Sequence, residues 1–215
     1  MRLGTYYRAQ ILKHFGIRAV GENVLDVGAY DGYWLSTQKA KNKYALDLEV
    51  VKKYQNIMYI KASALKIPFT SNHFDQIFAF DVIEHIKEGQ EKKFLSELIR
   101  VCKRNGEITL STPSKSITLF PSFMTGYISS KWGHDKCNGY SKKELKNMLS
   151  IFDGIIYQVV DNSAPLYRLL YMMVRFLWFI RQDIAKKVVH KIALYDAKHK
   201  KGDKGFYFID IKKMQ

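Results

Sequence analysis

The chain has 215 residues, 47% of them hydrophobic and 26% charged, which is typical of one globular domain with its own core. Its two cysteines, Cys102 and Cys137, exclude a disulfide scaffold and lack metal-ligand spacing, and no secretory leader is evident, so we expect a cytoplasmic protein. The formal net charge of +15 indicates either a lysine-rich solvated surface or an acidic partner: nucleic acid, an anionic membrane or a phosphorylated substrate.

Strand and helix patterns alternate along the chain, which predicts a Rossmann-like α/β fold. We expect a doubly wound, mostly parallel seven-stranded sheet with helices on both faces and an antiparallel last strand. The expected strands are residues 24–27, 44–48, 57–61, 76–80, 107–111, 155–160 and 206–211. The expected helices include residues 3–15, 92–104 and 142–150.

Local signals mark several element ends. Asn105-Gly106 is expected to end the helix over residues 92–104. Ser141 and Glu144 match a capping box at the start of a helix. Between these points, residues 114–140 have turn formers and aromatics without a steady period. They predict a long, lid-like loop with a short helix, since loops of this length are usually functional or disordered.

Roughly forty residues, 163–204, separate the last two expected strands, where a short hairpin would suffice. This helical insertion is rich in apolar residues and is interrupted by arginines, and it is too short and too charged to span a bilayer. We expect residues 166–191 to lie on an anionic membrane surface, with Phe176, Trp178 and Phe179 facing the acyl boundary. The protein would then be peripheral at the inner face of the membrane. The alternatives are a helical cap on the sheet and a homodimer seam.

The segment over residues 23–32, NVLDVGAYDG, is the most informative local pattern. An apolar run ends in a turn bracketed by Gly28, which lets the backbone approach a ligand, and Gly32, which permits the turn into a helix. Asp47 ends the next apolar run, where its carboxylate can accept hydrogen bonds from both hydroxyls of a ribose. The spacing predicts a nucleotide-type site after the first strand.

Three stretches together resemble the class I S-adenosylmethionine-dependent methyltransferases, specifically the small-molecule group called type 11. They are residues 24–32, residues 44–47, and residues 67–69 running through 74–77 to 81–85; the likeness covers roughly residues 20–160. The resemblance implies S-adenosyl-L-methionine as cofactor, with the glycine loop at its methionine part and the acid after the second strand at its ribose. The cofactor-binding residues it implies are Asp26, Gly28, Ala29, Tyr30, Gly32, Asp47, Leu48, Ser63, Ala64, Phe80 and Asp81.

Two positions depart from the family pattern. Tyr30 stands where a second glycine is usual, and Ser63 stands where an aspartate facing the adenine is usual. We expect Tyr30 to stiffen the loop and to lean over the methionine part, and Ser63 to hydrogen-bond the adenine more weakly than a carboxylate.

Methyl transfer is an in-line displacement, so the protein mainly aligns donor and acceptor, and a base that removes the acceptor's proton assists. Asp81, Glu84 and His85 follow the fourth strand, at the edge where open parallel sheets bind ligands. The catalytic candidates are His85 as first base, His134 as second base, and Asp81. Alternatively, His85 packs at a helix start, His134 packs in its loop or contacts an acidic group, or the 81–85 cluster holds magnesium.

The acceptor is expected to be the oxygen or nitrogen of a small molecule or a lipid-linked compound. Base methylation of nucleic acid is disfavoured, because residues 81–84 read DVIE where a D/N-P-P-aromatic motif is usual and no cysteine lies nearby. Other RNA targets remain an alternative.

A nicotinamide dinucleotide site is disfavoured because Tyr30 and Tyr33 replace two of its glycines. A non-catalytic adaptor that binds the cofactor is the last alternative.

Overall fold

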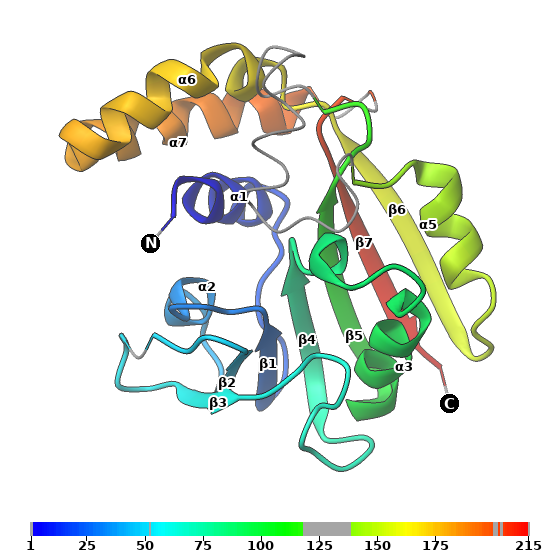
Figure 1. Cartoon of the computed structure of the whole chain (residues 1–215). Coiled ribbons are helices and arrows are strands. Elements are labelled where there is room, and N and C mark those ends of the chain that lie inside the picture. The colour runs from blue at the N-terminus through cyan, green and yellow to red at the C-terminus, as the bar shows by residue number, and fades with distance from the viewer. Residues whose placement is uncertain (1, 52, 118–138, 200–201, 203, 215) are drawn as a thin grey trace.

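The computed structural model describes residues 2–51, 53–117, 139–199, 202 and 204–214. Seven strands form one sheet in the order β3-β2-β1-β4-β5-β7-β6 (Figure 1). The strands are β1 (Asn23–Val27), β2 (Asn42–Asp47), β3 (Met58–Lys61), β4 (Phe74–Phe80), β5 (Cys102–Pro113), β6 (Ile155–Asn162) and β7 (Phe206–Lys213). The first five strands pair in parallel, and β7 runs antiparallel between β5 and β6. The predicted fold class is confirmed.

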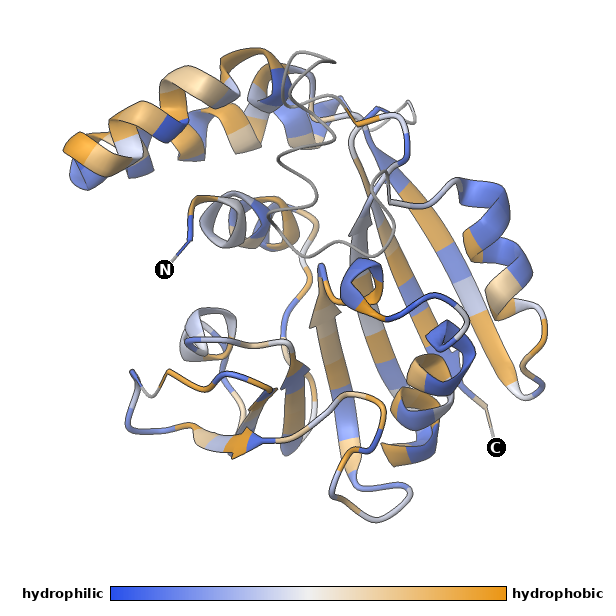
Figure 2. Ribbon diagram, viewed as in Figure 1, coloured by the Kyte–Doolittle hydropathy of each residue, from blue (hydrophilic) through white to orange (hydrophobic). Residues whose placement is uncertain are grey.

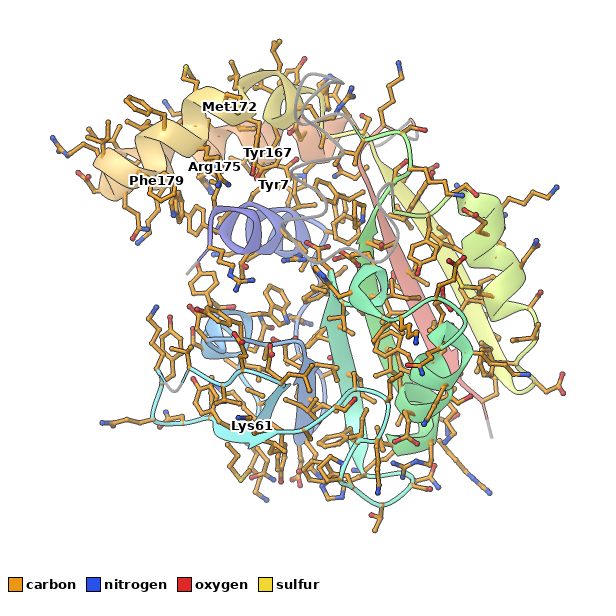
Figure 3. All side chains as sticks on the ribbon, viewed as in Figure 1. Tyr7, Lys61, Tyr167, Met172, Arg175 and Phe179 are labelled. Carbon is orange, nitrogen blue, oxygen red and sulfur yellow. The ribbon has the colours of Figure 1, made fainter. Side chains whose placement is uncertain are left out.

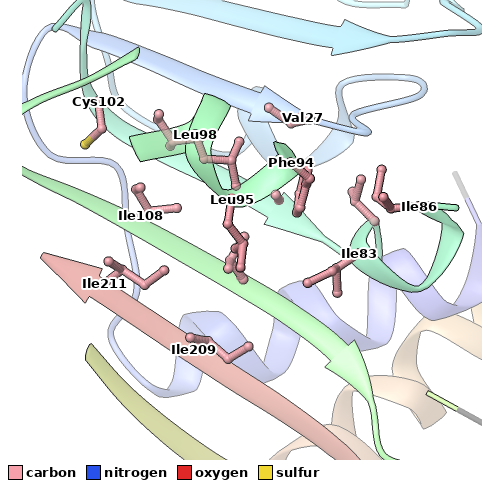
Figure 4. Packing of buried hydrophobic residues seen from close by; sticks show 14 of the residues in the cluster. Val27, Ile83, Ile86, Phe94, Leu95, Leu98, Cys102, Ile108, Ile209 and Ile211 are labelled. Carbon is pink, nitrogen blue, oxygen red and sulfur yellow. The ribbon is translucent and has the colours of Figure 1, made fainter. Parts of the chain in front are cut away.

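Two groups of helices pack on the sheet. The helices are α1 (Leu3–His14), α2 (Tyr33–Ser36), α3 (Glu91–Val101), α5 (Lys142–Leu149), α6 (Pro165–Ile180) and α7 (Gln182–Lys198), with a 3-10 turn, η1 (Ile83–His85). Residues of α3 and α5 share one buried cluster, which includes Phe94, Leu98 and Leu145 (Figure 4). Residues of α1, α6 and α7 share a second cluster, which includes Leu12 and Val189. The sheet is therefore covered from both faces.

Hydrophobic periodicity explains why these elements form. On α3, Phe94, Leu95 and Leu98 are buried at the three- and four-residue spacing that defines one helical face. On β4, six of the seven residues are buried, as expected for a central parallel strand. Figure 2 shows the hydropathy of the strands and helices along the ribbon. The capping box is also confirmed: Ser141 accepts a hydrogen bond from the Glu144 backbone, and Glu144 accepts one from Ser141.

The prediction for residues 92–104 is wrong at its C-terminal end. The helix stops at Val101, and β5 begins at Cys102. Asn105 takes a positive φ of 61°, and the strand register jumps from Phe74↔Cys102 to Gln76↔Glu107. A Cβ on Gly106 would lie 2.9 Å from the carbonyl oxygen of Asp75. The Asn-Gly pair therefore forms an irregularity inside β5, where asparagine and glycine tolerate the backbone that the bulge requires.

Two predicted segments flank the C-terminal strands. Most of the expected loop over residues 114–140 lies outside the described residues, although Ser114 and Tyr140 form a parallel bridge at its two ends. Between β6 and β7 the chain forms α6 and α7, with α6 against α7 and α7 against α1. This hairpin lies beyond the end of the sheet toward which the β4 arrow points (Figure 1). In the described part of the chain, no helix has the length and hydrophobicity needed to cross a membrane.

Candidate functional site

The turn after β1 brings two loops of the carboxyl edge together. Gly28 has a φ of 72°, and its N–H donates to the carbonyl of Leu46 at 2.7 Å. A Cβ at this position would stand 2.4 Å from Cγ2 of Val82, which follows β4. Only a glycine combines this backbone conformation with so close a neighbour. The turn therefore lies against both the end of β2 and the loop after β4.

Asp47 holds this turn in place. Its Oδ2 atom accepts a hydrogen bond from the backbone of Tyr30 at 2.7 Å, and its Oδ1 atom accepts one from the backbone of Glu49 at 3.0 Å. The backbone N–H of Ala62, after β3, donates to the carbonyl oxygen of Asp47 at 3.1 Å. Each carboxylate oxygen has a second acceptor site, so Asp47 retains capacity to accept from hydroxyls. Three loops thus meet at one partly exposed carboxylate.

Three further residues implied for the cofactor, of which Ser63 is the one expected to face the adenine, lie beside Asp47. Leu48 is 64% exposed, although it is a large apolar residue. Ser63 is half-buried, and its hydroxyl accepts a hydrogen bond from the backbone of Leu65 at 3.2 Å. Ala64 is also half-buried. The structure therefore places the apolar side chains of Leu48 and Ala64 and the hydroxyl of Ser63 at the carboxyl edge of the sheet, next to the glycine turn.

Tyr30 keeps the backbone of the glycine that it replaces. Its φ is 48°, in the left-handed region, which costs roughly 1–2 kcal/mol for a residue with a Cβ. The guanidinium of Arg2 lies 4.1 Å from the centroid of its ring. The tyrosine therefore preserves the turn, and its side chain pairs with the N-terminal segment of the chain.

Asp81 belongs to a cluster that the sequence analysis did not detect. It has a φ of 53°, its backbone N–H donates to the carbonyl of Ser111 at 2.9 Å, and the Ser111 hydroxyl donates to Asp81 Oδ1 at 2.8 Å. Its other oxygen pairs with Arg8 of α1, whose guanidinium also lies 5.5 Å from the centroid of the Phe80 ring. Nothing in the local sequence connects Arg8, Asp81 and Ser111, because only the fold brings α1 over the ends of β4 and β5.

Two further carboxyl groups at this edge are buried. Burial, together with the negative charge of Asp81, raises the pKa of Glu84 well above its usual value; the Thr112 hydroxyl donates to it at 3.2 Å. Burial raises the pKa of Asp26, which is 4% exposed, to about 8, and the charge of Arg8 opposes that shift. Burial therefore favours the protonated form of both groups, whereas Asp81 is ion-paired.

The turn η1 separates the two candidate residues that follow Asp81. Ile83 and Glu84 are buried, while His85 is exposed at the carboxyl edge. Among the described residues, no group of three His, Cys, Asp or Glu side chains is arranged to hold a metal ion, so Asp81, Glu84 and His85 do not form such a group. His134 lies outside the described residues.

A groove of about 610 Å³ lies elsewhere on the sheet. Gln76, Thr109, Gln158 and Asp210 contribute to its lining, together with the loop after α1. It contains none of the predicted site residues and lies along the part of the sheet away from the carboxyl ends of β1 and β4. We therefore assign the candidate site to the carboxyl edge, where the glycine turn, Asp47 and Asp81 lie.

Comparison with known proteins agrees with this geometry. Residues 25–110 match the family described as methyltransferase domain, a range that includes the glycine turn, Asp47 and the Asp81 loop. The matched range, together with the strand order and the antiparallel β7, makes the chain similar to class I S-adenosylmethionine-dependent methyltransferases in sequence over residues 25–110 and in fold.

Three similar proteins illustrate the range of this class. Phosphoethanolamine N-methyltransferase 2 of Caenorhabditis elegans is 23% identical over 175 residues, which are 74% of this chain and 38% of that protein. The structure of Haemonchus contortus phosphoethanolamine N-methyltransferase 2 with S-adenosyl-L-methionine has a TM-score of 0.66 and 18% identity, covering 99% of this chain and 53% of the other. The [4+2]-cyclase SpnF has a TM-score of 0.62 and 15% identity, covering 97% and 81%. The chain thus spans about half or less of the length of the two phosphoethanolamine relatives, and the structural likenesses establish the fold.

Proposed function

We propose that the protein transfers a methyl group from S-adenosyl-L-methionine to the oxygen or nitrogen of a small-molecule or lipid-linked acceptor. The observation that carries this proposal is the hydrogen bond of 2.7 Å between Asp47 and the backbone of Tyr30 in the glycine turn. This hydrogen bond joins a carboxylate that can accept from ribose hydroxyls to a turn whose backbone a ligand can approach closely. Both lie at the carboxyl ends of adjacent parallel strands, where open α/β sheets bind ligands.

The residues of the edge fit the parts of this cofactor. Asp47 would accept from the ribose hydroxyls, the backbone of Gly28, Ala29 and Tyr30 would border the methionine part, and exposed Leu48 would pack on the adenine. Ser63 and Ala64 would complete the adenine side, with Phe80 and Asp81 on the other side of the turn. Gly32 would support the turn, and buried Asp26 would support it from beneath. The bound cofactor supplies an electrophilic methyl group on a sulfonium.

The same edge provides groups that would orient and deprotonate an acceptor. Arg8 and Ser111 occupy both oxygens of Asp81, so we assign Asp81 to positioning as much as to proton removal. Exposed His85 remains the first candidate base because an imidazole nitrogen can accept the acceptor's proton. His134 remains the second. Glu84, whose protonated form is favoured by burial, would act as a hydrogen-bond donor.

Two features narrow the acceptor class. The named relatives act on phosphoethanolamine, an amine that carries a phosphate, and the net charge of +15 suits a phosphorylated acceptor. An RNA acceptor is the alternative that the same charge supports. The cyclase SpnF shows that this fold also serves another reaction.

The cofactor is tested by calorimetry with S-adenosylhomocysteine and with NAD. We expect micromolar binding of the first and none of the second. Asp47→Ala should weaken binding by about 1.5–3 kcal/mol, the range for hydrogen bonds to a charged group. Glu49→Ala is the matched control, since it removes an exposed carboxylate two residues away. Equal affinity in the Asp47 and Glu49 variants would remove Asp47 from the site.

The acceptor is tested with methyl-labelled cofactor and cell extract fractionated into lipid, RNA and small molecules. We expect label in the lipid or small-molecule fraction, and label in RNA alone would support the alternative. With the acceptor identified, His85→Ala and His134→Ala should show which base operates, through a loss of roughly 10²–10⁴-fold in turnover. If neither variant lost turnover, the base assignment would be wrong.

A further inference from the structure

Helix α6 is apolar on two opposite faces. Tyr167, Tyr171, Val174 and Trp178 recur at three- and four-residue intervals and are buried. Tyr167 stacks on Tyr7 of α1, with ring centroids 3.8 Å apart (Figure 3). A second apolar series, at the same intervals, faces away from the protein. Its members are Leu169, Met172, Met173, Phe176, Phe179 and Ile180.

This outer series, which we call the α6 outer face, is unusually exposed. Leu169 is 78% exposed, Phe176 69% and Phe179 76%. Figure 3 shows Met172 on the side of α6 away from Tyr7 and Tyr167. Single exposed apolar residues are ordinary, but a contiguous row of six along one helix face marks a binding surface. A helix that is apolar all round is normally surrounded by protein or lipid.

The structure corrects one part of the sequence interpretation. Trp178 was expected to face lipid together with Phe176 and Phe179, but it is 8% exposed, and its ring centroid lies 5.6 Å from that of Tyr6. The reason is helical geometry: Trp178 follows Val174 by four residues and shares its buried face. Phe176 and Phe179 lie on the opposite side.

The hairpin that carries the outer face is rich in basic residues, and the guanidinium of Arg175 lies 5.8 Å from the ring centroid of Phe179. The hairpin of α6 and α7, residues 165–198, contains seven Lys or Arg and two Asp. One of the acids, Asp196, is buried and accepts from Tyr7 and from the first turn of α6, and the other, Asp183, is paired with Arg181. Lys187 and Lys191 are exposed on α7. The hairpin that carries the apolar row is therefore strongly cationic.

We propose that the α6 outer face inserts into the interface of an anionic lipid bilayer, with α6 parallel to the membrane plane. Apolar side chains flanked by cationic ones are the pattern of helices that lie at the boundary between acyl chains and headgroups. In a dimer formed through this face, two positively charged surfaces would repel each other. Anionic lipid headgroups instead complement the positive charge. The length of α6 also favours this orientation, because a helix of 16 residues is too short to span a bilayer.

The inference stands on this surface and does not depend on the proposed function. It has one consequence for the site. Tyr7 of α1 contacts α6, and the next residue, Arg8, pairs with Asp81. Docking through α6 would therefore present the carboxyl edge of the sheet near the membrane surface.

The test is flotation of the purified protein with vesicles, without cofactor. Vesicles of phosphatidylcholine mixed with phosphatidylglycerol are compared with pure phosphatidylcholine, at low and high salt. We expect the wild type to float with the anionic vesicles, and rising salt to weaken but not abolish this binding because the apolar part is not screened. Lys187→Glu with Lys191→Glu should reduce binding by about fivefold or more for each lysine, which corresponds to about 1 kcal/mol.

The decisive variant is Met172→Ser, Phe176→Ser, Phe179→Ser. It changes only exposed side chains, so we expect an unchanged unfolding midpoint and a loss of flotation of at least tenfold. Met58→Ser with Ile151→Ser is the matched control, because these residues are 47% and 51% exposed and lie outside the hairpin. It should float like the wild type.

Three results would overturn the proposal. The first is a wild type that does not float with anionic vesicles, and the second is equal flotation of the wild type and the triple variant. The third is a dimer, seen by sedimentation, that the triple variant converts to monomer while neither protein binds vesicles. That result would assign the α6 outer face to a second copy of the chain.

Discussion

The two sides of the sheet are covered by helices of different character. On the side of α3 and α5, aliphatic and aromatic residues such as Phe94 and Leu98 are fully enclosed, and the outward helix surfaces are polar. On the side of α1, α6 and α7, the buried cluster is richer in aromatics, and α6 presents a second apolar face to solvent. The difference teaches that packing on the sheet accounts for the apolar residues of α3 and α5, whereas α6 has an apolar face that packing does not use, which is the proposed membrane surface.

The largest expected effect tests the core on the side of α3 and α5. Phe94 is completely buried, so Phe94→Ala should remove about 3–5 kcal/mol of unfolding free energy through lost burial and the cavity left behind. Urea denaturation followed by circular dichroism measures this. A loss below roughly 1 kcal/mol would show that the cluster under α3 is not a closely packed core.

The next effect tests the polar group that joins α1 to the hairpin. Asp196 accepts hydrogen bonds from the Tyr7 hydroxyl at 2.7 Å and from the backbones of Leu166 and Tyr167 at 2.8 and 2.9 Å. Asp196→Ala leaves these buried donors unsatisfied, which should cost about 3 kcal/mol. Asp183→Ala is the control on the same helix, and it should leave the denaturation midpoint unchanged. Similar behaviour of the two variants would mean that Asp196 does not anchor α6.

A smaller effect for each step of the measurement, up to about 1.4 kcal/mol per pH unit, comes from the buried carboxyl group in β1. Because the folded-state pKa of Asp26, about 8, lies above its unfolded value, the native state keeps a proton that the unfolded chain loses. Stability should therefore fall as pH rises from about 4 to about 8, by up to about 1.4 kcal/mol per pH unit. Asp26→Asn does not titrate and should reduce this slope. Urea midpoints measured across that range in both proteins provide the comparison; identical slopes would contradict it.

The smallest effect concerns the outer side of α6. Phe176→Ala should change the unfolding free energy by less than about 0.5 kcal/mol, because its side chain is mostly exposed. Measured beside Phe94→Ala, it compares the same substitution on the two sides of the molecule. A destabilisation as large as that of Phe94→Ala would show that the α6 outer face is covered within the protein.

Local patterns were enough to predict much of the architecture. The turn bracketed by Gly28 and Gly32, the acid after β2 and the capping box at Ser141 are short-range signals, and the structure contains each of them. The Asn105-Gly106 signal was also real but was placed in the wrong element, since it forms an irregularity in β5 instead of ending α3. A breaker pair indicates an irregular backbone without indicating which neighbouring element contains it.

The sequence by itself determined the order of strands and helices, the glycine turn and the position of Asp47, because these depend on hydrophobic periodicity and on conformations that few residues adopt. Only the tertiary structure decided that Arg8 pairs with Asp81, that Glu84 is buried while His85 is exposed, and which aromatic residues of α6 face the protein. The physical reason is that these facts depend on contacts between distant segments. In a helix that is apolar on two opposite faces, such as α6, periodicity cannot indicate which face packs on the protein.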